Sequence, residues 1–348
     1  MRVPMAALAL ALAILVSAVP ASIARPTAPP VLFGAGGWSF PSEATLDRLA
    51  DRGLRTWRLT VGWDHASPRP GVMDLSGYDQ VLRRARRHRI DVLVTLTGCP
   101  AWACPSGGPP KSGAALAGFR RFVRAAVRRW GHHGLRAVTH WQVLNEVNGA
   151  DQWAPRPSAA GYARLLVRTS RTIRAADRRA KVVVAGLGEK MTVWLRTYLP
   201  ALYRQRGFRR SFDVMAPEGY TTRPRDVGAI LTRTRRIMRR FGDGRKPLFV
   251  TEMGWSSGGP PFPFTTSERG QAARLTAAWT RLAACRSRWR LRRVYWFAYT
   301  DREAPPSSDY WGFHNGLLDA AGREKPAWQE FVRFLRPARA ARTAGRCR

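Results

Sequence analysis

The sequence predicts an α/β fold in which eight parallel strands, each followed by a helix, close into a barrel. Short apolar runs rich in β-branched residues alternate along the chain with longer amphipathic segments. Two of these runs, the fourth and the seventh, end in glutamates 106 residues apart. A barrel of about 250 residues has roughly 31 residues per unit, so this separation is about three units. Alternation of strands and helices favours a single parallel (β/α)8 TIM barrel over a sandwich.

The first to eighth strands are predicted in chain order at residues 31–37, 54–61, 90–97, 138–145, 181–187, 212–217, 247–252 and 292–298. Amphipathic helices are clearest at 74–89, 112–130, 157–179, 224–241 and 267–286. A doubly wound open sheet is the alternative arrangement of such elements. It usually has a glycine-rich phosphate-binding turn after the first strand, and 34–37 lacks the full pattern.

The ends of the chain differ in composition from the middle. Arg2, the apolar run from Ala6 to Val19 and the small residues before 25 are typical of a secretory signal peptide over 1–24. The alternative is an uncleaved anchor, but the run is shorter than the roughly 20 residues that span a bilayer. The barrel is expected over 25–337, and 338–348 is a basic tail. We expect a secreted or cell-wall-associated protein with no transmembrane segment after cleavage.

Four cysteines fit an oxidising compartment. The simplest of the three pairings joins Cys99 to Cys104 locally and ties Cys285 to Cys347 in the tail. No histidine stands at ligand spacing from these cysteines, and the six histidines show no metal-binding pattern. The sequence therefore predicts neither a metal nor another cofactor.

The formal net charge is +36, mostly from arginine. Such a charge can indicate a polyanion-binding protein. However, the arginines recur at helical spacing, as expected for solvent-facing sides of helices, and no nucleic-acid motif is present. We expect no specific nucleic-acid partner, although anionic cell-wall polymers could attract the protein.

The two strand-end glutamates, Glu146 and Glu252, are the candidate catalytic residues. Strand ends at the mouth of a barrel carry chemistry, and carboxylates three strands apart can face each other across a substrate. Glycoside hydrolysis needs this arrangement of two carboxyl groups. The alternative for each glutamate is an ion pair with one of the many arginines.

Several motifs resemble clan A glycoside hydrolases, family 39 in particular. Those around the glutamates are Asn145–Gly149 with Trp153, and Thr251–Trp255. The others lie in the segments 99–102, 296, 316–319 and 325–328. The resemblance covers most of the chain after the signal peptide. It implies a retaining glycosidase with Glu146 as the acid/base and Glu252 as the nucleophile.

The resemblance and the residue types also suggest substrate-binding positions. Asn145 is expected to bind the sugar 2-hydroxyl, Arg58 to keep Glu252 charged, and Tyr220 to hydrogen-bond Glu252. Trp296 is expected as a stacking floor, with Trp102 and Trp153 at the rim. The chain departs from the family where relatives often have His-Pro-Tyr, because it carries Glu218-Gly219-Tyr220.

The expected partner is a carbohydrate polymer, either an exopolysaccharide or a cell-wall glycan, cleaved internally. Two alternatives stay open: a family 5-like endoglucanase or mannanase, and a noncatalytic carbohydrate-binding barrel.

Overall fold

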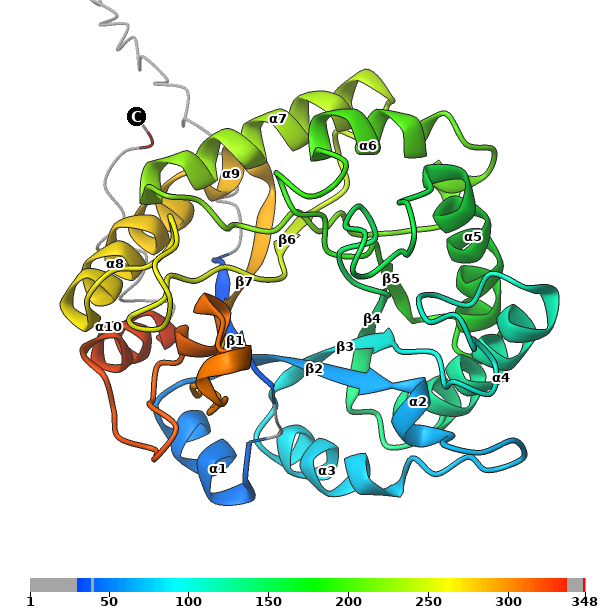
Figure 1. Ribbon diagram of the computed structural model, residues 1–348, viewed down its shortest axis with the longest axis horizontal. Coiled ribbons are helices and arrows are strands. Elements are labelled where there is room, and N and C mark those ends of the chain that lie inside the picture. The colour runs from blue at the N-terminus through cyan, green and yellow to red at the C-terminus, as the bar shows by residue number, and fades with distance from the viewer. Residues whose placement is uncertain (1–29, 39–40, 337–346, 348) are drawn as a thin grey trace, which may run out of the picture.

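The computed structural model describes residues 30–38, 41–336 and 347. A central ring of strands is surrounded by a ring of helices (Figure 1). This arrangement confirms the predicted (β/α)8-type fold. The predicted signal peptide, and the predicted tail except for Cys347, lie outside the described residues.

Seven parallel strands form the sheet, in the order β5-β4-β3-β2-β1-β7-β6. They are β1 (Leu32–Gly36), β2 (Thr56–Gly62), β3 (Asp91–Thr97), β4 (Val138–Val143), β5 (Lys181–Val183), β6 (Leu248–Val250) and β7 (Leu291–Phe297). Each lies within or next to a run that the sequence analysis expected. Because β1 pairs with both β2 and β7, the first and last strands of the sheet lie side by side.

The expected sixth strand, 212–217, is not a regular strand. It forms isolated parallel bridges, from Val214 to Val183 in β5 and from Met215 to Leu248 in β6. Two features explain the irregularity. The Asp213 carboxylate accepts a hydrogen bond from the Val182 amide, and Pro217 has no N–H for a ladder. The segment nevertheless joins the two edge strands and closes the ring.

The five expected helices are present with shifted ends. They correspond to α3 (Asp79–Arg87), α4 (Gly113–Trp130), α5 (Ala159–Ala176), α7 (Val227–Arg240) and α8 (Glu268–Ala284). The structure adds the shorter helices α1 (Glu43–Asp51), α2 (Trp63–Ala66), α6 (Leu195–Tyr203), α9 (Arg286–Trp289) and α10 (Pro326–Leu335). Four helices start at a serine whose hydroxyl accepts a backbone N–H of the first turn, namely Ser42, Ser112, Ser158 and Ser267.

The apolar core has two layers. A small cluster fills the inside of the ring and consists of Leu93, Val183, Val214, Ala216, Phe249 and Tyr295. The larger cluster includes the other strand face and the buried sides of the helices. Alternation in β2 shows the division, since Trp57, Leu59 and Val61 belong to the larger cluster while Arg58 between them does not.

Both predicted disulfides, Cys99–Cys104 and Cys285–Cys347, are confirmed. The second connects the end of α8 with the chain's penultimate residue. Over the described residues, no helix has the length and apolar character needed to cross a membrane.

Candidate active site

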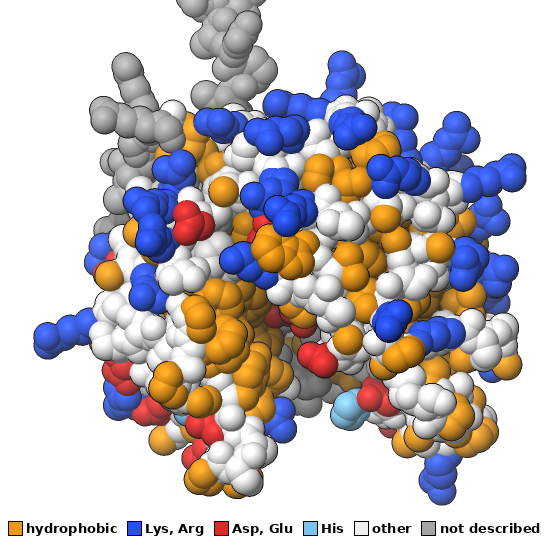
Figure 2. Space-filling model, turned by 45° about the horizontal axis from the view of Figure 1, so that its top comes forward, with side chains coloured by type: hydrophobic (Ala, Val, Ile, Leu, Met, Phe, Trp, Pro, Cys, Tyr) orange, Lys and Arg blue, Asp and Glu red, His pale blue; other side chains and the backbone are white. Residues whose placement is uncertain are grey.

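The carboxyl ends of the strands surround a cavity of about 1020 Å³. Residues from the ends of β2, β3, β4, β6 and β7 line it, together with the loops that follow β5 and the irregular sixth segment. Figure 2 shows a hollow with hydrophobic side chains along one side and acidic side chains inside, while Lys and Arg spread over the outer surface. This cavity contains both predicted catalytic glutamates.

Glu252 receives three hydrogen bonds from donors on separate parts of the chain. Arg58 Nη1 and Asn145 Nδ2 donate to Oε1 at 2.8 and 3.1 Å, and Tyr220 OH donates to Oε2 at 3.0 Å. Glu252 is only 7% exposed. The cation and the two further donors satisfy this buried carboxylate. The predicted contacts of Arg58 and Tyr220 with Glu252 are therefore present.

Arg58 is held by its own neighbours. Its Nε donates to Gln142 Oε1 at 3.0 Å, and its Nη2 donates to Asn145 Oδ1 at 3.1 Å. Thr95 also donates to Gln142 Oε1, at 2.8 Å. Arg58 lies inside the ring because inward and outward side chains alternate along β2. The guanidinium is thus fixed by residues of β3, β4 and the β4 loop before any ligand binds.

Glu146 has a different environment. Its φ is +45° and that of Leu144 is +64°, both in the left-handed region. Such backbone costs of order 1 kcal/mol per residue and clusters at functional sites. No cation pairs with Glu146 in the described part of the chain. Burial, and next the negative charge of Glu252, raise the pKa of Glu146 to about 7.

A third carboxyl group, that of Glu218, completes the buried cluster. Glu218 is 1% exposed, and neither oxygen accepts a hydrogen bond from a donor among the described residues. Burial, followed by the charges of Glu146 and Glu252, raises the pKa of Glu218 well above its usual value. The sequence analysis noted Glu218 only as a departure from the family motif.

One wall of the cavity is aromatic and comes from two loops. Phe262 and Phe264 lie in the loop after β6, while Tyr310 and Trp311 lie in the loop after β7. Trp311 stacks on Phe262, with ring centroids 5.0 Å apart and ring planes at 4°. Tyr220 packs edge-on against Trp311, with ring centroids 5.6 Å apart. These residues were not predicted, because aromatic residues in irregular loops show no periodicity.

The tryptophans predicted as sugar platforms do not line the cavity. Trp296 is fully buried, donates to the Asn315 carbonyl and packs between Trp255 and Trp279, so its prediction as a stacking floor is wrong. Its side chain points away from the ring interior. The neighbouring Phe297 lines the cavity instead.

The two predicted rim tryptophans also have other roles. Trp153 is 3% exposed and packs edge-on against Tyr162, so it belongs to the core. Trp102 is 38% exposed, but it packs against Trp63, donates to the Ser67 carbonyl and is not part of the cavity lining. Neither supports the predicted rim.

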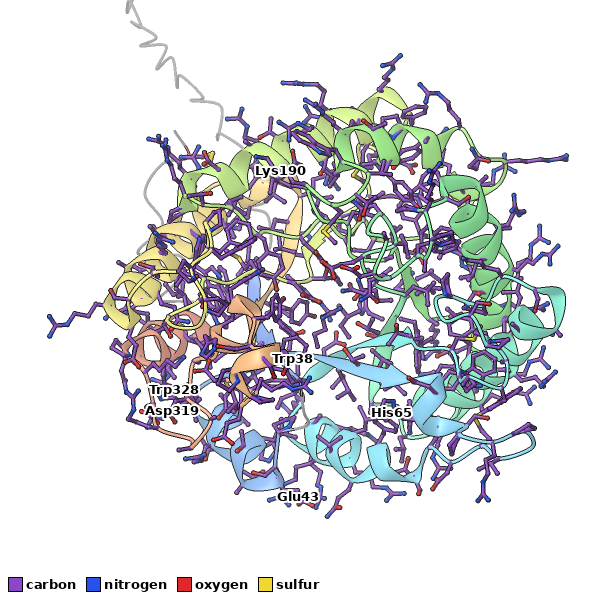
Figure 3. All side chains as sticks on the ribbon, in the orientation of Figure 1. Trp38, Glu43, His65, Lys190, Asp319 and Trp328 are labelled. Atoms are coloured by element: carbon purple, nitrogen blue, oxygen red, sulfur yellow. A yellow bond between two sulfur atoms is a disulfide. The ribbon has the colours of Figure 1, made fainter. Side chains whose placement is uncertain are left out.

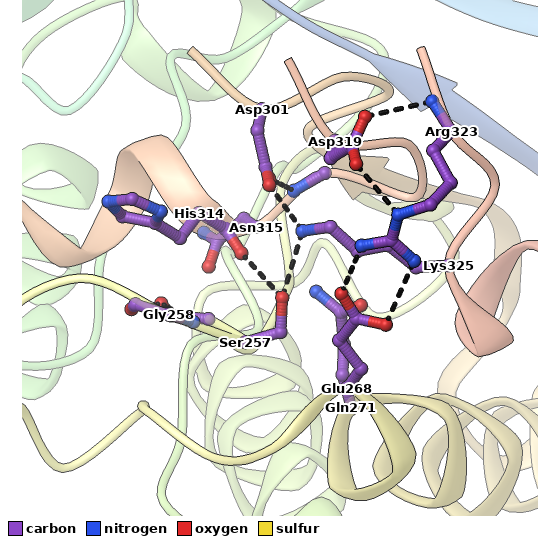
Figure 4. Close-up of polar contacts among 12 residues, drawn as sticks. Ser257, Gly258, Glu268, Gln271, Asp301, His314, Asn315, Asp319, Arg323 and Lys325 are labelled. Atoms are coloured by element: carbon purple, nitrogen blue, oxygen red, sulfur yellow. Dashed lines mark hydrogen bonds and ion pairs between the residues drawn. The ribbon is translucent and has the colours of Figure 1, made fainter. Parts of the chain in front are cut away.

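Polar contacts join the two loops that carry the aromatic wall (Figure 4). Lys325 donates to Ser257 Oγ at 2.8 Å and pairs with Asp301. Ser257 in turn donates to the His314 carbonyl, and Asp301 Oδ1 accepts the Gly316 amide at 2.6 Å. The Lys325 side chain is 2% exposed. The wall is therefore anchored by a buried ion pair.

The charged side chains that line the cavity are mainly acidic. Trp38 and Lys190 lie on opposite sides of the central opening (Figure 3), and both line the cavity. Six carboxyl groups but only three cationic side chains line it, in contrast to the basic whole chain. Among the described residues, no group of three or more His, Cys, Asp or Glu is arranged to hold a metal ion.

No protein-family model matches the chain, and no curated protein matches it either. Solved structures do match. A family 39 glycoside hydrolase from Bacteroides cellulosilyticus WH2 aligns at 19% identity and a TM-score of 0.68, over 90% of this chain and 64% of its own. The exo-β-1,4-mannosidase of Opitutaceae bacterium strain TAV5 aligns at 18% identity with a TM-score of 0.65, over 90% of this chain and 60% of its own.

The GH39 enzyme from Xanthomonas axonopodis pv. citri aligns at 20% identity with a TM-score of 0.61, over 88% of this chain and 67% of its own. The chain thus spans about two thirds of the length of these proteins or less. At such identities the likeness establishes the fold, which is the (β/α)8 barrel of these glycoside hydrolases.

Proposed function

We propose that this protein is a retaining glycoside hydrolase. The observation that carries the proposal is the contrast between two carboxyl groups in one cavity. Glu252 accepts hydrogen bonds from an arginine, an amide and a phenol, whereas Glu146 forms no ion pair with a described residue and its pKa is raised to about 7. Pairs of carboxyl groups whose environments separate them in this way divide the roles of nucleophile and acid.

In the first step Glu252 attacks the anomeric carbon, and the bond from that carbon to the leaving oxygen breaks. Glu146 gives its proton to that oxygen, which then departs as a hydroxyl group. In the second step Glu146 takes a proton from water, whose oxygen attacks the anomeric carbon and releases Glu252. The proposal assigns binding of the sugar 2-hydroxyl to Asn145, and the contacts of Asn145 with Arg58 and Glu252 support this role.

The proposed substrate is a polysaccharide, cleaved internally outside the cell. Support for a secreted enzyme comes from the two disulfides. Support for carbohydrate binding comes from the aromatic wall, because the C–H faces of sugar rings pack on aromatic rings. The similar folds of the family 39 enzymes and the mannosidase are consistent with either a family 39-like or a family 5-like specificity.

The test is hydrolysis of a panel of aryl glycosides and polysaccharides, followed by proton NMR of the first-formed sugar. Retention of the anomeric configuration is the expected result, and inversion would refute the assigned roles. A protein that binds glycans from the panel but hydrolyses none would be the noncatalytic barrel. Product sizing in the first minutes distinguishes internal cleavage from release of monosaccharide alone.

A further inference from the structure

The buried carboxyl of Glu218 has an environment that does not suit an anion. One of its oxygens, Oε1, and the side-chain oxygen of Asn145 both lie in the space that a side chain at Gly186 would fill, at 2.3 and 2.4 Å from that Cβ position. The orientation of Asn145 is fixed, because its oxygen accepts from Arg58 and its nitrogen donates to Glu252. Glu218 therefore faces an acceptor, not a donor.

Among the described residues, no cation forms an ion pair with Glu218, and neither of its oxygens has a hydrogen-bond partner. All three guanidinium nitrogens of Arg58 already donate, to Gln142, Glu252 and Asn145. On the loop after β5, Gly186 lies against Oε1 and Gly188 lies near Oε2 of Glu218. An ionised carboxylate without partners at 1% exposure is strongly unfavourable.

The titratable and charged groups that interact with Glu218 are Glu146 after β4, Glu252 after β6 and Arg58 on β2. Burial, and then nearby carboxyl groups including Glu218, raise the pKa of Tyr220, two residues along the same segment, and of Tyr310 in the loop after β7. Three carboxyl groups thus share one arginine. Since Arg58 pairs with Glu252, the charges on Glu146 and Glu218 are not offset by an ion pair among the described residues, and both carboxyl groups favour their protonated forms.

We propose that Glu218 is a neutral carboxylic acid that donates a hydrogen bond to Glu146 and so positions the acid/base through both steps of the reaction. This inference rests on the proposed function for its catalytic consequence. Glu218 itself touches no reacting atom, so it is a positioning residue. Its effect is exerted on the ionised form of Glu146, which appears when Glu146 has given its proton to the leaving group and which then acts as the base.

The proposed hydrogen bond from Glu218 to Glu146 shifts the pKa of Glu146 in a definite direction. A neutral donor stabilises the Glu146 carboxylate and lowers the pKa of Glu146, against the larger rise caused by burial and Glu252. An ionised Glu218 would instead repel that carboxylate and raise its pKa. Removing the Glu218 side chain therefore moves the basic limb of the pH–rate profile to higher pH if Glu218 is a neutral donor and to lower pH if it is an anion.

The kinetic test compares Glu218→Gln with the wild type. Glutamine keeps a neutral donor, so the basic limb of kcat/KM is expected to stay within about half a pH unit of its position near pH 7. Glu218→Ala removes the donor, so the limb should rise by about one to two units and kcat should fall. A fall of one unit or more in the glutamine variant would overturn the proposal, because it would show that a negative charge had been removed.

Asp151→Asn provides a control with the opposite sign. Asp151 also lines the cavity, and its charge raises the pKa of Glu146. Removing that charge should move the basic limb of the kcat/KM profile to lower pH. If Asp151→Asn and Glu218→Gln both lowered the limb, Glu218 would be an anion like Asp151.

A second measurement does not depend on activity. Carbon-13 NMR of the protein labelled at the glutamate carboxyl carbon follows each titration directly, with Glu218→Gln and Glu146→Gln for assignment. Glu218 should remain protonated at the pH where Glu146 ionises. Titration of Glu218 below pH 5 would overturn the proposal. If the NMR result holds but no glycoside is hydrolysed, the proposed function fails while the neutral carboxylic acid stands.

Discussion

Arg58 Nη1 donates to Glu252 Oε1 at 2.8 Å, joining residues 194 positions apart in a pair whose side chains are 3% and 10% exposed. The pair spans the ring between β2 and the end of β6. Because the guanidinium also binds Gln142 and Asn145, one residue connects the candidate nucleophile with the strand that leads to Glu146. The charge distribution of the site therefore depends on Arg58.

We expect Arg58→Met to reduce kcat/KM by about a hundredfold or more, because it leaves the Glu252 charge buried without a cation. Arg58→Lys should also lose at least about tenfold, since one ammonium cannot reproduce the planar fork that serves three partners. Arg293→Met is the matched control, because Arg293 is a buried arginine paired with Asp91 outside the cavity lining. It should lower the melting temperature with no comparable loss of kcat/KM in the folded protein. Equal kinetic losses in both variants would show that Arg58 is only structural.

Removal of each catalytic carboxyl should have a distinct signature. Glu252→Gly should abolish turnover, and added azide should restore reaction of an aryl glycoside with inverted product. Glu146→Ala should keep more activity on a dinitrophenyl glycoside than on a glycan, because a good leaving group departs without protonation. Azide should accelerate this variant to a β-configured azide product. NMR of the azide adducts checks both assignments. If each variant gave the azide product expected of the other, the roles of Glu146 and Glu252 would be reversed.

Glu146→Gln should make the protein more stable at neutral pH. The native pKa of Glu146 is about 7, above its ordinary value of 4.5. As pH rises from 4.5 to 7, the unfolded chain ionises while the native group stays protonated, so the native state loses stability through this window. The glutamine variant avoids that loss, which amounts to about 1–3 kcal/mol.

Urea unfolding at pH 4, 5.5 and 7.5 measures this difference. The advantage of the variant should grow with pH and level off above about pH 7. The exposed Glu303 offers a control, since Glu303→Gln should show no such growth. An advantage that is constant with pH would contradict the raised pKa.

Trp311→Ala should weaken binding of longer substrates. Its ring is part of the stacked wall with Phe262, so its loss should raise KM for an oligosaccharide by about tenfold while leaving hydrolysis of a small aryl glycoside largely unchanged. Trp194→Ala is a suitable control, because Trp194 is 39% exposed and does not line the cavity. Equal losses on both substrates would place Trp311 at the cleavage position instead.

Lys325→Met should destabilise the protein by about 3–5 kcal/mol, because it leaves Asp301 buried without its cation. The double variant Lys325→Met/Asp301→Asn should recover most of that loss, since asparagine is neutral and can still accept the Gly316 amide. Thermal unfolding measures both. Arg323→Met removes more exposed ion pairs and should lower the stability much less than Lys325→Met. A similar cost for Lys325 would mean that the pair does not anchor the loops.

The sequence by itself determined the repeating architecture and the two principal carboxyl groups. The spacing of apolar residues is a local property of the sequence, so strands and long helices could be located from their own segments alone. Glu146 and Glu252 could be found because each follows a strand, and parallel strands in a barrel place their carboxyl ends on one face. The same reasoning located Arg58, whose position in an apolar strand was unusual for a charged residue.

Only the tertiary structure decided which other residues reach the cavity. Trp296 and Phe297 are neighbours in β7, yet alternation sends Trp296 into the outer core and brings Phe297 to the site. The aromatic wall depends on how two loops fold against each other, and loop conformation has no sequence period. The proposed proton on Glu218 follows from the absence, over the described residues, of a donor to this buried carboxyl group. That absence is a property of the surrounding residues from several elements, so it exists only once the barrel has closed.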